Sequence, residues 1–231
     1  MTLPNSRQLQ LALRGRSSWG GRRPGAGRKP GPRPQVRHAR RAHFRRLPSH
    51  VTLRIRPGLP SLRTVAIVRA IEHSFADACA RPGFRLAQYS LHGNHVHLIV
   101  EAADRQTLGR GMKAIGARLA RAVNRFASHH GPVLADRYHL RLLPTPREVH
   151  RALRYVLLNA RRHAKRPRAA LGRRLTLDPA SSARWFEGWK RRGPSPPPSG
   201  SGPCPVAPPR TWLLRAGWRR HGLIDPADVP G

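Results

Sequence analysis

Two histidines, His95 and His97, are separated by a single residue in a stretch where polar and apolar residues alternate. The alternation predicts a β-strand over 95–101, and the residues just before it, 92–94, predict a turn. Successive side chains of a strand point to opposite faces, so both imidazoles share one face, about 7 Å apart. Such a pair can hold one metal ion or one phosphate. The alternative is two ordinary, partly buried histidines, and the pair alone does not decide between them.

A second candidate pair, Tyr155 and Asn159, lies downstream in a predicted helix. The sequence Thr145-Pro146-Arg147-Glu148 combines a capping box with proline at the first helical position, which predicts a helix start. Apolar residues then recur at helical spacing: Val149, Leu153, Val156, Leu157 and Ala160. Tyr155 and Asn159 are four residues apart, so they lie together at the border of this apolar stripe. A border tyrosine is common in ordinary packing, so this pair alone indicates little.

The elements that must position these residues alternate in a recognisable order. Period-two patterns predict strands over about 50–56, 84–91, 95–101 and 137–143, and helical periodicity predicts helices over about 60–80 and 107–129. The order strand, helix, strand, strand, helix, strand is the split βαβ, or ferredoxin-like, arrangement of an α+β fold with an antiparallel sheet. The two helices cover one face of such a sheet. The other face is expected to display Thr52, Arg54, Arg56, His95, His97, His139 and Arg141.

The apolar stripes of these elements predict the core. The first helix contributes Leu62, Val65, Val68, Ile71, Phe75 and Cys79, and the second contributes Leu108, Met112, Ile115, Leu119, Val123 and Phe126. Two of the three tyrosines, Tyr89 and Tyr138, fall on the apolar side of predicted strands, so we interpret them as core residues. Tyr155 is then the best candidate for a nucleophilic tyrosine.

The charge is extreme and uneven. The 231 residues include 45 Lys and Arg against 10 Asp and Glu, a formal net charge of +35. The first 71 residues carry 17 of the basic residues and no acidic one. Such an excess of positive charge calls for a polyanionic partner, and arginine favours bidentate phosphate contacts. No segment has the length and hydropathy of a membrane span or signal peptide. The two distant cysteines, Cys79 and Cys204, exclude a zinc finger or disulfide framework, so a cytoplasmic protein that binds nucleic acid is expected.

Composition divides the chain into three parts. Residues 1–46 are rich in Gly, Pro and Arg and predict a basic flexible arm, in which Arg28 and Lys29 are candidate phosphate contacts. Residues 47–165 hold the predicted folded domain. Residues 166–231 predict a basic extension with a Pro/Ser/Gly linker at 193–209 and four of the five tryptophans. These tryptophans either stack on the bases of a single strand or hold the tail on the domain.

Taken together, the sequence motifs of this chain resemble those of the REP-associated tyrosine transposases of bacteria, which belong to the single-tyrosine HUH transposase and endonuclease superfamily. The resemblance covers residues of about 45–165 well and the ends loosely. It rests on His50-Val51-Thr52, His92-Gly93-Asn94-His95-Val96-His97, Asp136-Arg137-Tyr138-His139, Thr145-Pro146-Arg147-Glu148-Val149, Tyr155-Val156-Leu157-Leu158-Asn159 and Ser181-Ser182-Ala183-Arg184-Trp185-Phe186. No single motif is specific, but their combination in this order is.

The resemblance implies a role for each matching residue. His95 and His97 would be metal ligands, Asn159 the third protein ligand where related enzymes often use Gln, and Tyr155 the nucleophile. This chain departs from the family's usual Asn-Pro by carrying Ala160. The implied cofactor is a divalent cation, Mg²⁺ or Mn²⁺, and imidazole ligands suit Mn²⁺ better. Further candidate DNA contacts are Arg54, Arg56, Arg137, His139 and Arg141.

The implied activity is cleavage and rejoining of single-stranded DNA through a 5′-phosphotyrosine, with a preference for hairpin or palindromic repeats. The enzyme would act as a monomer or homodimer in the bacterial cytoplasm, close to the nucleoid. The residues leave two alternatives open. One is a catalytically silent nucleic-acid-binding protein of the same fold. The other is a metal-dependent phosphoesterase that uses water and forms no covalent intermediate.

Overall fold

The computed structural model describes residues 47–162, 177–190 and 203–228. Its elements in chain order are β1 (Ser49–Arg54), α1 (Val65–Ala76), β2 (Ala80–Arg81), β3 (Phe84–Leu91), β4 (His95–Ala102), α2 (Arg105–Ala127), β5 (His139–Leu142) and α3 (Pro146–Arg162). Three short elements follow: η2 (Ser182–Trp185), α4 (Trp212–Arg215) and η3 (Gly217–His221). No described helix has the length and apolar character needed to span a membrane.

The strands form one antiparallel sheet in the order β2-β3-β4-β1-β5. Without the two-residue β2, this is the order of a ferredoxin-like sheet, so the predicted α+β fold class is confirmed. The short β2 was not predicted. It pairs with the start of β3 through the turn Pro82-Gly83, where Gly83 has φ +73°, a conformation that favours glycine.

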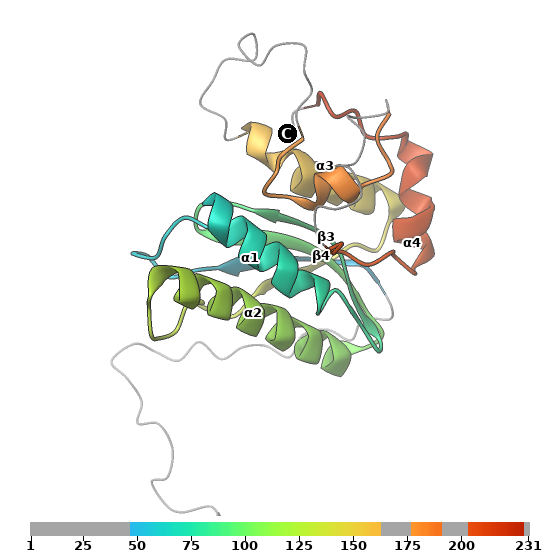
Figure 1. Cartoon of the computed structure of the whole chain (residues 1–231). Helices are drawn as coiled ribbons and strands as arrows, with labels where there is room; N and C mark the ends of the chain where they lie inside the picture. The colour runs from blue at the N-terminus through green and yellow to red at the C-terminus, as the bar shows by residue number, and fades with distance from the viewer. Residues whose placement is uncertain (1–46, 163–176, 191–202, 229–231) are drawn as a thin grey trace, which may run out of the picture. The chain divides into compact units, whose positions relative to one another are not determined.

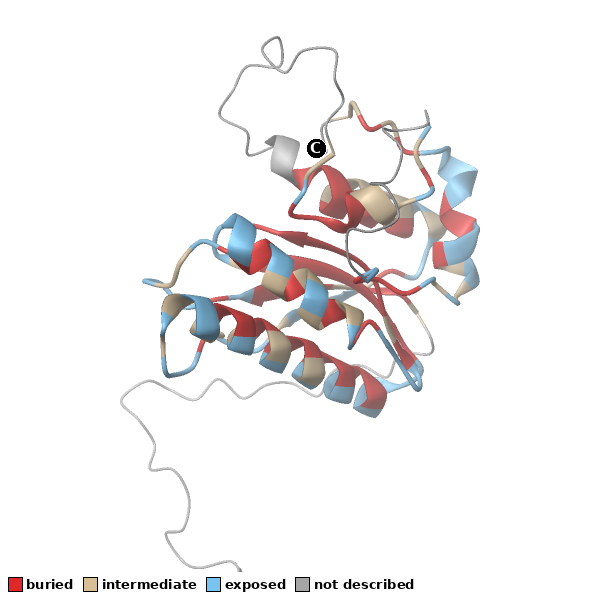
Figure 2. Ribbon diagram, in the orientation of Figure 1, coloured by how far each residue is buried: buried red, intermediate tan, exposed pale blue. Residues whose placement is uncertain are grey.

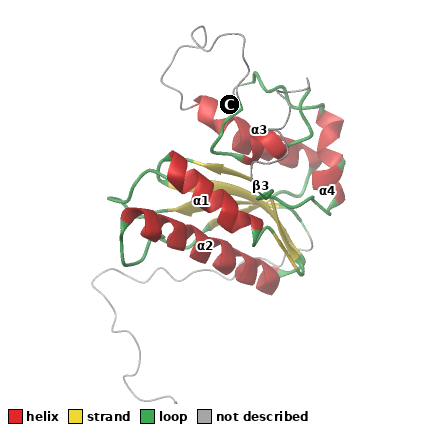
Figure 3. Cartoon of the chain, viewed as in Figure 1, coloured by secondary structure: helices red, strands yellow, loops and turns green. Residues whose placement is uncertain are grey.

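Helices α1 and α2 cover one face of the sheet, and α3 lies over the opposite face with α4 beside it (Figures 1 and 3). The first face carries the expected apolar side chains of β1 and β4, which are Val51, Leu53, Val96, Leu98 and Val100. Both faces of the central strands are largely buried (Figure 2). The protein therefore has two apolar clusters, one on each side of the sheet.

Two residues of the predicted helical stripes are exposed. Val65 is 66% exposed because α1 begins only at this residue, and the buried Leu62 belongs to the turn before the helix. Phe126 is 44% exposed and lies in the last turn of α2, just before the Ser128 cap, so it has packing partners on one side only. The remaining predicted stripe residues of the first two helices are buried, among them Ile71, Met112 and Cys79.

The second face of the sheet is less open than the sequence predicts. Three residues connect β5 to α3, which folds back across this face and buries Ile99 and Ala87 against its own apolar stripe. His97 is buried and Thr52 half-buried for the same reason. The basic residues Arg54 and Arg56, near the end of β1, and His139 and Arg141, on the edge strand β5, remain exposed as predicted.

The C-terminal segments complete this second face. Glu101 of β4 is buried, and its carboxylate accepts hydrogen bonds from the backbone N–H of Arg210 (2.7 Å), the backbone N–H of Thr211 (2.8 Å) and the hydroxyl of Thr211 (2.6 Å). Thr211 in turn caps α4. A single carboxylate on the sheet therefore fixes the start of α4.

The tryptophans divide between the two predicted roles. Trp218 is 2% exposed, packs in the second cluster and donates to the carbonyl of Leu214 (3.0 Å), so it holds the tail on the domain. Trp189 is half-buried and donates to the carbonyl of Ala183. Trp212 is 52% exposed, and the Arg220 guanidinium lies above its ring at 4.8 Å. Stacking of a DNA base on Trp212 stays a prediction.

Candidate functional site

The histidine-bearing turn brings three imidazoles together. The backbone N–H of His92 donates to the carbonyl of His95 (2.8 Å), so the two residues face each other across the two-residue turn Gly93-Asn94. Residues that flank such a turn lie on the same face of a hairpin, and His97 is two residues further along that face. The rings of His92 and His95 stack at 4.6 Å, and His97 meets both edge-on.

The three imidazoles are close enough to hold one metal ion. One ring nitrogen from each of His92, His95 and His97 lies within 4.8 Å of the other two. His92 and His97 are buried and His95 is half-buried, so the cluster has one partly open side. Neutral imidazole is a common ligand of divalent transition metals. The sequence singled out His95 and His97 but missed His92 as a member of the cluster, although the spacing His-X-X-His around a two-residue turn contains the signal.

Helix α3 places Tyr155 directly over this cluster. The Tyr155 hydroxyl lies 3.4 Å from Nε2 of His97, and the two rings meet edge-on at 5.0 Å. Tyr155 is half-buried, and its ring packs against the second apolar cluster while its hydroxyl reaches the polar site. Thr145 caps the start of α3 as predicted: its Oγ1 accepts from the Glu148 N–H (3.2 Å), and its hydroxyl donates to the Glu148 carboxylate (2.9 Å).

The other two tyrosines pack with the first apolar cluster, on the opposite side of the sheet from His97. Tyr89 is fully buried on β3 and donates to Glu72 (3.0 Å). Burial and the neighbouring Glu72 carboxylate raise the pKa of the Tyr89 hydroxyl, which makes it a poor nucleophile. Tyr138 is partly buried and packs against the first apolar cluster.

Asn159 is fully buried, not a border residue. One turn beyond Tyr155, its Nδ2 lies 3.2 Å from Nε2 of His92, which also contacts Ser90 Oγ at 3.2 Å. The Asn159 Oδ1 atom is buried and has no hydrogen-bond partner among the described residues. A buried amide oxygen without a partner is costly, and a cation would satisfy it. The donor set of imidazoles plus one amide oxygen therefore fits a divalent metal ion.

Strand β1 supports His97 from the other side. Nδ1 of His97 lies 3.1 Å from Nε2 of His50 and 3.1 Å from Oγ1 of Thr52. Contacts of this kind fix the orientation and the tautomer of a ligand imidazole. Burial, together with the Arg141 guanidinium, lowers the pKa of His50 to about 4, so its ring is neutral at pH 7.

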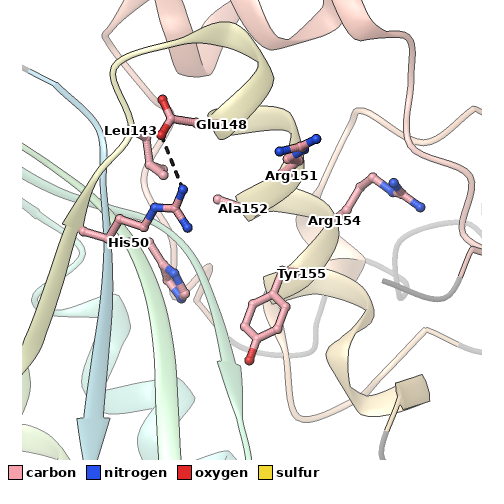
Figure 4. Close-up of a pocket in the computed structure, with 8 residues that line it drawn as sticks. His50, Leu143, Glu148, Arg151, Ala152, Arg154 and Tyr155 are labelled. Atoms are coloured by element: carbon pink, nitrogen blue, oxygen red, sulfur yellow. Dashed lines mark hydrogen bonds and ion pairs between the residues drawn. The ribbon is translucent and has the colours of Figure 1, made fainter. Parts of the chain in front are cut away.

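The predicted DNA contacts within the described residues are on the surface. Arg54, Arg56, Arg137, His139 and Arg141 are all exposed, and Arg28 and Lys29 lie outside the described residues. Arg141 lines a pocket beside Tyr155 together with two arginines of α3 that the sequence did not single out, Arg151 and Arg154 (Figure 4).

Comparisons with known proteins give matches to solved structures alone. No protein-family model and no curated protein matches the chain. One similar structure is a REP-associated tyrosine transposase bound to a REP hairpin, at 13% identity over 56% of this chain and 75% of that chain, with a TM-score of 0.46. Another is a Deinococcus radiodurans R1 protein assigned as a transposase, at 16% identity over 46% of this chain and 85% of that chain, with a TM-score of 0.36. At these identities and TM-scores, neither likeness bears on function.

Proposed function

We propose that this protein is a metal-dependent transposase or endonuclease of the single-tyrosine HUH class that cleaves and rejoins single-stranded DNA. One observation carries the proposal: the hydroxyl of Tyr155, on α3, lies 3.4 Å from Nε2 of His97 in a three-histidine cluster on a separate hairpin. The hydroxyl of a buried tyrosine usually meets a polar partner, and here that partner belongs to the cluster that can hold a metal ion. The motif order that resembles the REP-associated tyrosine transposases supports the same assignment.

The proposed ligands of a divalent cation, Mn²⁺ or Mg²⁺, are His95, His97 and Oδ1 of Asn159. His92 orients the Asn159 amide and lies close enough to add a further nitrogen donor. When bound, the cation supplies positive charge next to a non-bridging phosphate oxygen.

Tyr155 performs the covalent step. Its hydroxyl loses a proton, and the phenolate oxygen forms a bond to phosphorus while the bond from phosphorus to the 3′ oxygen breaks. The products are a 5′-phosphotyrosine and a free 3′-hydroxyl, which takes up a proton. The ester linkage is conserved, so attack by a 3′-hydroxyl on the phosphotyrosine rejoins DNA without ATP. Thr52 and His50 hold the imidazole of His97 below the tyrosine throughout.

The covalent intermediate gives a direct test. Purified full-length protein is incubated with radiolabelled single strands that contain hairpins of varied sequence, with Mn²⁺, with Mg²⁺ or with EDTA, and denaturing gels report protein linked to DNA. We expect a metal-dependent covalent band, lost in Tyr155→Phe by roughly a thousandfold or more. Tyr138→Phe is the matched control and should retain the band. Cleavage without a band would identify a water-using phosphoesterase, and binding without cleavage across all strands would identify a silent binding protein.

A further inference from the structure

A pocket of about 470 Å³ lies next to Tyr155, between strands β1 and β5 on one side and α3 on the other. We propose that this pocket binds one nucleotide of the single-stranded DNA next to the phosphodiester that Tyr155 attacks, with Arg151 and Arg154 on its phosphate. This inference rests on the proposed function for the identity of the strand, but the pocket is separate from the metal ligands. Figure 4 shows Arg151, Arg154 and Tyr155 on one helix, with His50 on the strands opposite that helix.

The charge of the pocket is strongly positive. Its lining residues include three arginines, Arg141, Arg151 and Arg154, against the single acidic residue Glu148. Glu148 is partnered by Arg141 at 3.4 Å and by the Thr145 hydroxyl at 2.9 Å. The Glu148 carboxylate therefore pairs with Arg141 at the start of α3. It does not neutralise the positive charges of Arg151 and Arg154. Guanidinium groups bind phosphate oxygens in bidentate fashion.

Arg151 and Arg154 are available to such a phosphate. Arg151 is exposed and forms no ion pair with any residue in the described part of the chain. Arg154 meets Asp228 at 3.1 Å, but both side chains are about one-third exposed or more. Its Nε atom is buried and has no hydrogen-bond partner within the described ranges. An ion pair this exposed contributes only about 0–1 kcal/mol, so a phosphate can replace Asp228.

The remaining walls favour a nucleotide over a bare phosphate ion. Leu143, Ala152 and the Tyr155 ring give the pocket an apolar side on which a base can lie. Its volume falls in the range of about 300–1,000 Å³ that is usual for small-ligand sites. Strand β5 is at the edge of the sheet, so a strand of DNA can enter past β5 without crossing another strand of the sheet. Because Arg151 lies four residues before Tyr155 in α3, the two side chains are neighbours on the helix surface, and a phosphate bound by Arg151 would lie beside the nucleophile.

Fluorine NMR can test the pocket without any cleavage. The protein contains three tyrosines, so labelling with 3-fluorotyrosine gives three signals, and Tyr155→Phe identifies the one from Tyr155. The probe is the tetranucleotide dT4, titrated into full-length protein in EDTA so that no chemistry occurs. We expect the Tyr155 signal to move, and the apparent affinity to fall roughly tenfold in Arg151→Gln and in Arg154→Gln. Arg110→Gln and Arg121→Gln, exposed on α2 over the opposite face, are matched controls and should bind as the wild type does.

Several outcomes would overturn the inference. In one, dT4 causes no shift of the Tyr155 fluorine signal. In another, the pocket variants and the α2 control variants bind dT4 with equal affinity. A tetranucleotide with neutral methylphosphonate linkages should lose the response, and retention would exclude phosphate recognition. Inorganic phosphate that binds as tightly as dT4 would exclude a nucleotide site, and tighter binding of the RNA tetramer rU4 would exclude DNA.

The two proposals can fail independently. A covalent DNA adduct that forms normally in Arg151→Gln and Arg154→Gln, with no dT4 response at Tyr155, would remove the pocket inference alone. A normal dT4 response without any adduct on hairpin strands would remove the proposed activity and leave a nucleotide-binding pocket. Arg151 is exposed, so its replacement leaves the fold intact and keeps the test interpretable if Arg154→Gln is unstable.

Discussion

The two faces of strand β4 show how one sequence serves two different purposes. On the face toward α1 and α2, Val96, Leu98 and Val100 are fully buried in a continuous apolar cluster. On the face toward α3, the strand presents His95 and His97 at one end and Glu101 at the other, with Ile99 between them. The first face contributes stability by excluding water. The second buries polar groups beside specific partners, and those groups position the tyrosine and the tail.

The two faces of β4 should respond differently to substitution. Substitutions on the apolar face should act on the whole molecule, because a cavity there weakens the packing of both helices and the sheet. Substitutions on the α3 face should have local effects, on the anchoring of α4 or on the affinity for a metal ion. The following predictions test that distinction.

The largest effect is expected on the apolar face. Leu98→Ala removes a fully buried side chain and should lower the free energy of unfolding by about 2–5 kcal/mol, measured by urea denaturation. His95→Ala, on the opposite face and half-buried, is the matched control and should cost less than about 1 kcal/mol. Equal losses would show that both faces serve mainly as core.

The next effect concerns the far end of the second face. Glu101→Ala leaves the N–H groups of Arg210 and Thr211 without their acceptor and should weaken the anchoring of α4 by about 1.5–3 kcal/mol. Amide hydrogen exchange should speed up over residues 212–218 while the strands keep their protection. Glu187→Ala, an exposed glutamate, should change neither. Loss of protection throughout the sheet would show that Glu101 has a global role.

A smaller effect is expected at the histidine end. His92→Ala removes the neighbour that orients Asn159 and should weaken Mn²⁺ binding roughly 10- to 100-fold, measured by isothermal titration calorimetry. His139→Ala, exposed on β5, should bind as the wild type does. Unchanged affinity in His92→Ala would restrict the ligands to His95, His97 and Asn159.

The smallest effect on Mn²⁺ binding should come from the tyrosine itself. Tyr155→Phe loses only a long contact of 3.4 Å to His97, so Mn²⁺ affinity should stay within about twofold of the wild type. The same variant is expected to lose the covalent DNA adduct. A large drop in Mn²⁺ affinity would mean that the tyrosine oxygen is a metal ligand, and that would contradict its role as nucleophile.

Local patterns in the sequence determined much of this protein. Period-two alternation predicted four of the five strands, including the face shared by His95 and His97, because side-chain direction in a strand depends only on the backbone. The capping box predicted the start of α3, which the structure confirms at Pro146. The four-residue spacing placed Tyr155 and Asn159 on one side of that helix for the same local reason.

Only the tertiary structure decided what these residues meet. Asn159 is fully buried because α3 packs over the histidine hairpin. The place of His92 in the cluster, by contrast, follows from the local two-residue turn. The contact between Tyr155 and His97 joins residues 58 positions apart, and Glu101 fixes a tail more than a hundred residues away. Backbone periodicity gives no information about such distances, because they depend on how the layers stack and on which cluster each layer buries.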